Sequence, residues 1–187
     1  MWNNFFGELV TVFWYFLPAG VANVVPILVA KMPYLENWNT PVDCGVKLGG
    51  VRLLGDHKTW RGVLFGVTGA GLTFLITFSL VGRLNFAGPD LRDVVYNFAF
   101  LFGCWIGLGA LVGDAVKSFF KRKMKIAPGK SWYFFDQVDY VLGASVFTFW
   151  IVPLPWYDYL LGMFFWGIVS LGMSYIGYLV RFKKSPV

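Results

Sequence analysis

The sequence predicts an all-α integral membrane protein with about five transmembrane helices. Of its 187 residues, 57% are apolar and only 14% are charged, and the mean hydropathy is +0.61. A soluble domain of this size rarely carries so few charges. The apolar residues are grouped in runs of about 20, the length that a helix needs to cross a bilayer. The basic residues lie almost entirely in alternate connections between these runs, which is typical of polytopic membrane proteins.

The predicted spans cover residues 5–30, 60–81, 94–124, 135–152 and 156–180. The first is interrupted by Pro18, Gly20 and Pro26, and it lacks the basic start of a signal peptide, so we expect a retained helix. The third passes Gly113 and continues as one helix. Proline residues at 153 and 155 end the fourth. We expect the five spans to form a single membrane-embedded domain over residues 1–187.

The distribution of basic residues predicts the orientation. One side of the membrane would carry 14 of them, namely Lys31, Lys47, Arg52, Lys58, Arg61, Lys117, Lys121, Arg122, Lys123, Lys125, Lys130, Arg181, Lys183 and Lys184. The other side would carry only Arg83 and Arg92. Cytoplasmic loops are enriched in Lys and Arg, so the N-terminus is predicted outside and the C-terminus in the cytoplasm. An odd number of spans places the two termini on opposite sides of the membrane, in agreement with this orientation.

Four reactive or polar side chains are assigned no chemistry. Cys44 and Cys104 have neither metal-ligand spacing nor the pattern of a disulfide framework, so two reduced thiols are expected. His57 is the only histidine, and a lone histidine in a loop is more often solvated than catalytic. Asn23 needs a polar partner within the bilayer, which either a neighbouring helix or a substrate could supply.

One polar helix face is predicted near the cytoplasmic end of the third span. Asp114, Lys117, Ser118 and Lys121 stand at positions i, i+3, i+4 and i+7, so they share one face of the helix. Arg122 follows directly. The alternative interpretation is that these basic residues only anchor the helix at the membrane surface.

A second acidic pair follows a short connection. Asp136 and Asp139 share a face at the start of the fourth span, and the two helices are predicted to be antiparallel neighbours. Their carboxylates would then meet Asp114, and three carboxylates repel one another unless a cation lies among them. Oxygen ligands favour Mg²⁺ or Mn²⁺ over zinc. The alternative is that the pair only complements the helix dipole.

A basic segment precedes the second span. Lys58 and Arg61 supply positive charge, Thr59 a hydroxyl group and Gly62 a close backbone approach, all of which suit an anion. If Thr59 caps the helix, the N-terminal amides would add a phosphate site. The preceding glycines are spaced as in a P-loop, but Asp56 stands where a lysine is required, so this motif is rejected. The alternative is an ordinary basic helix entry.

Four motifs in the same order resemble those of the CDP-archaeol synthases, which are similar to, but smaller than, CDP-diacylglycerol synthases. The motifs are Thr40-Pro41-Val42-Asp43, the segment from Leu54 to Gly62, the segment from Gly113 to Arg122, and Trp132 with Asp136-Gln137-Val138-Asp139. The resemblance covers about residues 18–143. It implies a membrane cytidylyltransferase that joins CTP to 2,3-bis-O-geranylgeranylglycerol 1-phosphate and releases pyrophosphate.

The resemblance also implies residue roles. The metal ligands would be Asp114, Asp136 and Asp139, which with Lys117 and Lys121 form the catalytic set. The nucleotide-binding set would be Asp43, Asp56, Lys58, Thr59, Arg61, Gly62, Ser118 and Arg122. The implied cofactor is Mg²⁺ or Mn²⁺, and the implied partners are CTP, a lipid phosphate and membrane lipid. No nucleic-acid partner is expected, and the active site would face the cytoplasm.

The chain shows no Ser–His or Cys–His nucleophile pair, and this chemistry needs none. A lipid phosphomonoester is largely ionised at neutral pH, so it can itself attack the CTP α-phosphorus in line. The alternative of the same class is an enzyme acting on ester lipid phosphates. The alternative of another class is a small transporter or lipid-binding scaffold. Transporters place polar sites near the midplane between repeated halves, whereas this sequence has no internal repeat and gathers its charges at one face.

Overall fold

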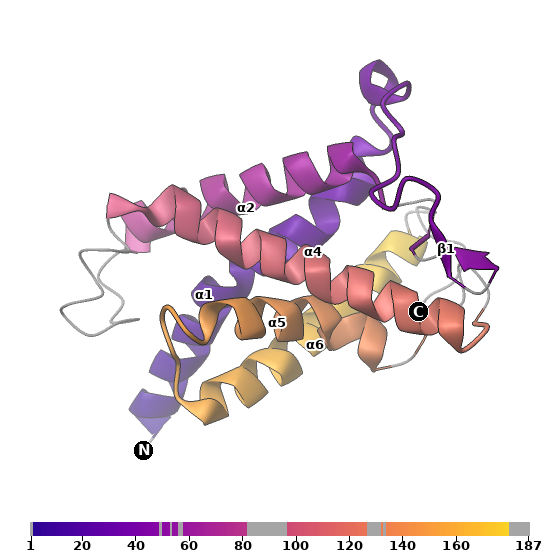
Figure 1. Cartoon of the computed structure of the whole chain (residues 1–187). Helices are drawn as coiled ribbons and strands as arrows, with labels where there is room; N and C mark the ends of the chain where they lie inside the picture. Colours follow the sequence, from indigo (N-terminus) through magenta and orange to yellow (C-terminus); the bar gives the residue numbers. More distant parts are fainter. Residues whose placement is uncertain are drawn as a thin grey trace.

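The computed structural model describes residues 2–48, 50–52, 54–55, 58–81, 97–126, 132 and 134–179. Within them the α-helices are α1 (Trp2–Val29), α2 (Trp60–Val81), α4 (Ala99–Lys123), α5 (Phe135–Thr148) and α6 (Trp156–Leu179) (Figure 1). A 3-10 helix, η1 (Pro33–Leu35), and an antiparallel hairpin of β1 (Lys47–Leu48) and β2 (Val51–Arg52) lie between α1 and α2. The predicted all-α class and the five helices are confirmed, and the small hairpin was not predicted.

Four of these helices, α1, α2, α4 and α6, are long and apolar enough to cross a membrane. The predicted starts of the second and fifth spans agree with α2 and α6. The first residues of the predicted third span lie outside the described ones. The predicted fourth span was too long, because α5 ends at Thr148. Its 14 residues reach about 21 Å, less than the hydrocarbon core of about 30 Å.

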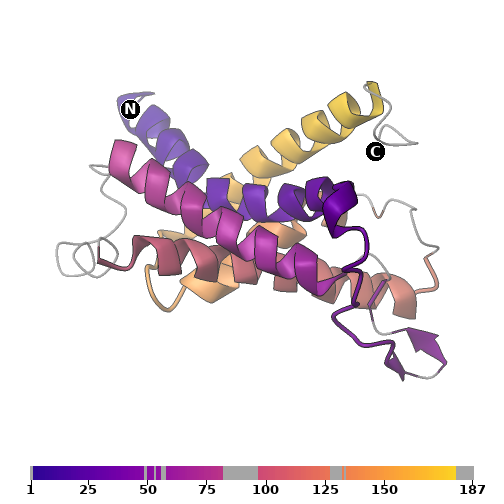
Figure 2. The ribbon, with the colours of Figure 1, turned by 90° about the horizontal axis from the view of Figure 1, so that it is seen from above.

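Helix α1 is continuous, so the predicted interruption of the first span was wrong. Pro18 and Pro26 both lie inside the helix, and Pro18 is fully buried. A proline removes one backbone hydrogen bond and presses on the preceding turn, which bends a membrane helix without ending it when neighbouring helices pack around it. The ribbon of α1 changes direction part-way along its length (Figure 2).

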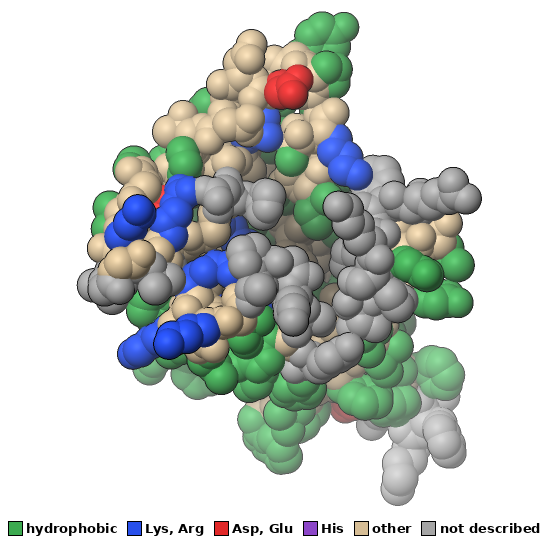
Figure 3. All heavy atoms as spheres, turned by 90° about the vertical axis from the view of Figure 1, so that its right-hand side faces the viewer, with side chains coloured by type: hydrophobic (Ala, Val, Ile, Leu, Met, Phe, Trp, Pro, Cys, Tyr) green, Lys and Arg blue, Asp and Glu red, His purple; other side chains and the backbone are tan. Residues whose placement is uncertain are grey.

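The helices alternate in direction along the chain. The hairpin, the start of α2, the end of α4, the start of α5 and the end of α6 gather at one end of the molecule, and α1 begins at the opposite end (Figure 1). Lys and Arg side chains cluster on the first of these ends (Figure 3). Among the described residues, Lys and Arg therefore gather at the end that the sequence predicts, and the orientation in the membrane stays a prediction.

Helix α4 lies at the centre of the bundle and packs against α1, α2 and α5. The most deeply buried side chains include Val12 and Phe16 of α1, Ile106 of α4 and Val141 of α5. Hydrogen bonds from buried side chains to backbone carbonyl oxygens also connect the helices of this apolar core. The Tyr140 hydroxyl of α5, for example, donates to the carbonyl oxygen of Trp166 in α6 at 3.0 Å.

Glycines let α4 and α5 approach to backbone contact. A Cβ on Gly143 would overlap the carbonyl oxygen of Gly109 and lie 2.8 Å from the Cα of Gly113. A Cβ on Gly113 would overlap the carbonyl oxygen of Asp139. Gly113 adjoins Asp114, and Asp139 lies one turn before Gly143. This close contact therefore sets how near the carboxylates of the two helices can come.

Candidate active site

Three carboxylates surround one ammonium group where α4 and α5 meet. The Lys117 Nζ lies 3.1 Å from Asp114 Oδ1, 3.0 Å from Asp136 Oδ1 and 2.6 Å from Asp139 Oδ2. All four side chains are largely buried, and that of Asp139 is only 6% exposed. The predicted convergence of the acids is therefore present, with a lysine at its centre.

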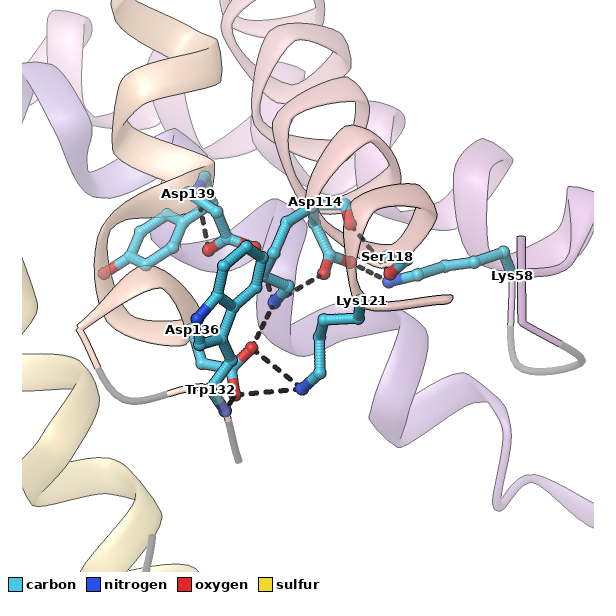
Figure 4. Close-up of polar contacts among 9 residues, drawn as sticks. Lys58, Asp114, Ser118, Lys121, Trp132, Asp136 and Asp139 are labelled. Carbon is cyan, nitrogen blue, oxygen red and sulfur yellow. Dashed lines mark hydrogen bonds and ion pairs between the residues drawn. The ribbon is translucent and has the colours of Figure 1, made fainter. Parts of the chain in front are cut away.

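Two further lysines border this cluster (Figure 4). Lys58, just before α2, donates a hydrogen bond to Asp114 Oδ2. Lys121, one turn beyond the central lysine on α4, lies 3.1 and 3.2 Å from the two oxygens of Asp136. The backbone N–H of Trp132 also donates to Asp136 Oδ2, at 2.6 Å. The sequence could not indicate this contact of Trp132, because it is made by a backbone group and does not depend on the residue type.

We name these six side chains the lysine–carboxylate centre: Lys58, Asp114, Lys117, Lys121, Asp136 and Asp139. Three ammonium groups face three carboxylates, so the formal charges of the centre balance. Charges so buried attract one another more strongly than exposed pairs do, and water screens them less.

The oxygen-only donor set of the three aspartates suits Mg²⁺ or Mn²⁺. The spacing is not that of a formed metal site. Among the described residues, no group of three or more His, Cys, Asp or Glu side chains is placed to hold a metal ion. The carboxylate oxygens stand 2.6–3.1 Å from the lysine nitrogen, whereas Mg²⁺ binds oxygen at about 2.1 Å. The chemistry of the donors fits, and the oxygens would have to move inward.

Asp43 is buried within the loop that carries the hairpin. Its Oδ1 lies 3.0 Å from the Arg52 guanidinium and accepts the N–H of Gly45 at 3.1 Å, and its Oδ2 accepts the N–H of Leu54 at 3.0 Å. Burial alone would raise the pKa of Asp43, but these donors outweigh it and hold the pKa below its ordinary value. Both oxygens are thus engaged in holding the loop, and a nucleotide contact by this residue stays a prediction.

Thr59 caps α2, as the sequence suggested. Its Oγ1 accepts the backbone N–H of Gly62 at 3.3 Å. The N–H of Trp60, the first residue of α2, donates to the carbonyl oxygen of Thr40 at 3.0 Å. Two amides of the first turn are therefore already used, which leaves this helix end less able to bind phosphate than an open one.

Arg61 contacts the segment that follows α1. Its side chain is buried, and its Nη1 donates to the carbonyl oxygen of Leu35 in η1. This contact ties the start of α2 to the segment that follows α1. A phosphate contact by Arg61 stays a prediction.

The remaining predicted residues have local contacts or lie outside the described ones. The Ser118 hydroxyl donates to the carbonyl oxygen of Asp114, one turn earlier in α4, at 2.8 Å. Arg122 donates to the carbonyl oxygen of Ile126 at 3.0 Å, where α4 has ended. Asp56 and His57 fall outside the described residues.

An apolar cavity of about 540 Å³ lies between α1, α2 and α4, and the sequence did not indicate which residues line it. Its apolar lining includes Ile27, Val63, Leu108, Leu111 and Val112. Lys58 and Asp114 also line it, so the cavity meets the lysine–carboxylate centre directly. Asn23, for which the sequence left open a contact with a neighbouring helix or with a substrate, also lines the cavity.

This fold and this site define a class: a polytopic helical membrane protein in which a buried charged centre adjoins an apolar cavity. A charged centre beside an apolar cavity is suited to an amphipathic molecule with a charged head and apolar chains.

Comparison with known proteins identifies the family. The CarS-like model, CDP-archaeol synthase, matches residues 5–187. A CDP-archaeol synthase of Methanocaldococcus jannaschii is 35% identical over 96% of this chain and 97% of its own length. One of Pyrococcus furiosus is 30% identical over 93% and 95%. A solved structure described as an intramembrane enzyme for archaeal membrane lipids biosynthesis aligns with a TM-score of 0.70 and 27% identity, over 86% of this chain and 90% of its own. The chain belongs to the CDP-archaeol synthase family and is an integral membrane protein.

Proposed function

We propose that this chain transfers the cytidylyl group of CTP to 2,3-bis-O-geranylgeranylglycerol 1-phosphate, forming a CDP-archaeol-type lipid and releasing pyrophosphate. Its family membership supports this activity. The observation that carries it in the structure is the meeting of the lysine–carboxylate centre with the apolar cavity at Lys58 and Asp114.

The reaction needs charge neutralisation and positioning more than a protein nucleophile. The ionised lipid phosphate attacks the α-phosphorus of CTP, a new P–O bond forms, and the bond to the β-phosphate breaks. Negative charge grows on the departing pyrophosphate. Lys58, Lys117 and Lys121 are the cations of this chain that lie at the centre, and each can donate hydrogen bonds to phosphate oxygens.

The carboxylates have a different role in this proposal. Asp114, Asp136 and Asp139 would hold Mg²⁺ or Mn²⁺, which supplies positive charge to the triphosphate when bound. Helices α4 and α5 carry all three, and their glycine contact keeps the acids within reach of one another. In this role the carboxylates hold the metal ion and do not transfer a proton.

The cavity supports the lipid part of the proposal. Its walls are apolar over most of their surface, so they suit isoprenoid chains better than a cytosine base. A lipid with its chains along α1, α2 and α4 would bring its phosphate to Lys58 at the edge of the charged centre. We further propose that this end of the molecule faces the cytoplasm, where CTP is available, since Lys and Arg gather there (Figure 3).

The direct test is a substrate panel with the purified chain in detergent. CTP, UTP, GTP and ATP are crossed with an ether-linked isoprenoid glycerol phosphate and a diacyl glycerol phosphate, with and without Mg²⁺, and pyrophosphate is measured. We expect release only with CTP, the ether lipid phosphate and the metal together. Release with the diacyl substrate at an equal rate would favour the ester-lipid alternative. No release with any lipid phosphate would refute the enzyme proposal.

A further inference from the structure

The central lysine of the site occupies the position that a cation would need. Lys117 Nζ lies within 3.1 Å of an oxygen from each of Asp114, Asp136 and Asp139. An ammonium group has three N–H donors, which equals the number of carboxylates around it. Its side chain is 13% exposed, so water screens these ion pairs little.

The neighbouring lysine on the same helix is placed differently. Lys121 contacts Asp136 alone among the three acids in the ion pairs of the described residues. Its loss would leave the other two carboxylates with their cations. Lys117 is therefore the residue whose charge all three carboxylates share.

The contact with the most buried acid is close but poorly directed. Asp139 Oδ2 lies 2.6 Å from Lys117 Nζ, yet this buried oxygen has no hydrogen-bond partner of good geometry among the described residues. Asp139 Oδ1, in contrast, accepts the N–H of Tyr140 at 2.8 Å. The Lys117 ammonium group is thus the cation that faces Oδ2, and another cation that binds this oxygen has to displace it.

A divalent ion cannot join this arrangement unchanged. A divalent ion held by the same carboxylate oxygens would compete with the ammonium group for them, and like charges repel strongly in a buried site. The lysine must leave the carboxylates when the metal enters. Its flexible four-carbon stem permits such a movement, and a triphosphate nearby would accept its hydrogen bonds.

We propose that Lys117 is an internal substitute cation, which neutralises the three carboxylates in the empty enzyme and moves to the nucleotide phosphates when the metal takes its place. This inference rests on the proposed function, because it takes the three aspartates as the metal ligands. It has a thermodynamic consequence. When the metal binds alone, the displaced lysine has no new partner, whereas the phosphates of bound CTP give it one. The metal and CTP therefore each strengthen the binding of the other by the same factor.

Mn²⁺ binding to the full-length protein in detergent tests this, with electron paramagnetic resonance reporting free Mn²⁺. Lys117→Gln removes the competing charge and is expected to bind Mn²⁺ at least about tenfold more tightly than the wild type without nucleotide. CTP should strengthen Mn²⁺ binding more in the wild type than in the variant. Lys123→Gln is the matched control, because it makes the same charge change at an exposed position of α4. It should leave both values unchanged.

Equal or weaker Mn²⁺ binding by a well-folded Lys117→Gln protein, with normal binding by the wild type, would overturn the substitute role alone. Failure of the wild type and the variant to bind Mn²⁺, with or without CTP, would overturn the metal site as well. A second measurement avoids any folding defect. Mn²⁺ added to the wild type should increase reductive methylation of Lys117, measured by mass spectrometry, relative to Lys123. Unchanged relative methylation would count against the proposal.

Discussion

Asp139 is the least exposed carboxylate of the lysine–carboxylate centre, and its Oδ2 lies 2.6 Å from the Lys117 ammonium group. Asp139→Asn keeps the shape of the side chain and its bond to the N–H of Tyr140 but removes the charge. We expect kcat to fall by about 100-fold or more, the size of effect seen when one group that stabilises a charged transition state is lost. The rate of pyrophosphate release from CTP measures this.

Asp158→Asn is the control for that substitution. Asp158 is also a buried carboxylate, in the first turn of α6, and α6 begins at the end of the molecule away from the centre (Figure 1). Turnover by this variant should remain close to that of the wild type. If Asp139→Asn turned over CTP as fast as Asp158→Asn, the carboxylate would have no part in the reaction.

Asp43 leads to a prediction about pH. Its pKa is lowered in the folded protein, so its contribution to stability is complete above the ordinary aspartate pKa of about 3.9 and is lost as the pH falls through the lower folded value. Asp43→Asn should reduce the free energy of unfolding by about 2 kcal/mol at pH 7, since hydrogen bonds to a charged group are lost. The difference from the wild type should shrink below about pH 4.

Thermal unfolding of both proteins from pH 7 to pH 3 measures this difference. Glu36→Gln, a change at an exposed acid in the same loop region, serves as the control and should show no such pH-dependent gap. A gap between wild type and Asp43→Asn that stayed constant to pH 3 would show that the carboxylate charge does not stabilise the loop.

For single residues, the sequence indicated which side chains of the predicted site share a helix face better than it indicated their contacts. The helical spacing of Asp114, Lys117 and Lys121 was enough to place them on one face. The carbonyl group that Arg61 contacts lies 26 residues earlier in the chain. Such a bond depends on how loops return to the helices, which the spacing of side chains does not report.

The contact between α4 and α5 decides the geometry of the site at the scale of elements. Gly143→Ala would place a methyl group against the carbonyl oxygen of Gly109 and 2.8 Å from the Cα of Gly113, so the helices must separate. A displacement of about 1 Å in a catalytic group can reduce the rate about 100-fold. We therefore expect kcat to fall by at least about tenfold, measured as CDP-lipid formation at saturating substrates.

Gly172→Ala is the matched control for this change. Gly172 lies in α6, and a Cβ there would meet no atom within 4 Å in the described structure. An alanine in the open face of a helix should be neutral or slightly stabilising, by up to about 1 kcal/mol. Wild-type turnover in a folded Gly143→Ala protein would mean that the backbone contact does not position the carboxylates.

Helix type and order could be predicted from apolar run length, but the details of α1 and α5 could not. Proline signals a helix end in water, yet in α1 both prolines lie inside a continuous helix because membrane packing compensates for the lost hydrogen bond. Residues after Thr148 are as apolar as the helix itself, so composition alone did not show where α5 ends. The cavity between α1, α2 and α4 depends on three helices at once and left no local pattern.

At the scale of the whole molecule, the described Lys and Arg residues gather at one end of an otherwise largely apolar bundle. The hairpin, the lysine–carboxylate centre and most of the described basic residues lie at the end that also receives the last turns of α4 and α6 (Figures 1 and 3). The exposed side chains of the long helices are largely apolar, as expected for surfaces that face lipid. The central claim at this scale is that cytidylyl transfer takes place at the charged end and that this end faces the cytoplasm.

Sealed vesicles of known orientation test this claim most directly. CTP does not cross the bilayer, so CTP added outside reaches only the exposed face, and CDP-lipid formed from an ether lipid phosphate in the membrane is measured. We predict product in inside-out vesicles, almost none in right-side-out vesicles until detergent opens them, and almost none with Asp139→Asn in either. Product in intact right-side-out vesicles, or unchanged product with Asp139→Asn, would contradict the account.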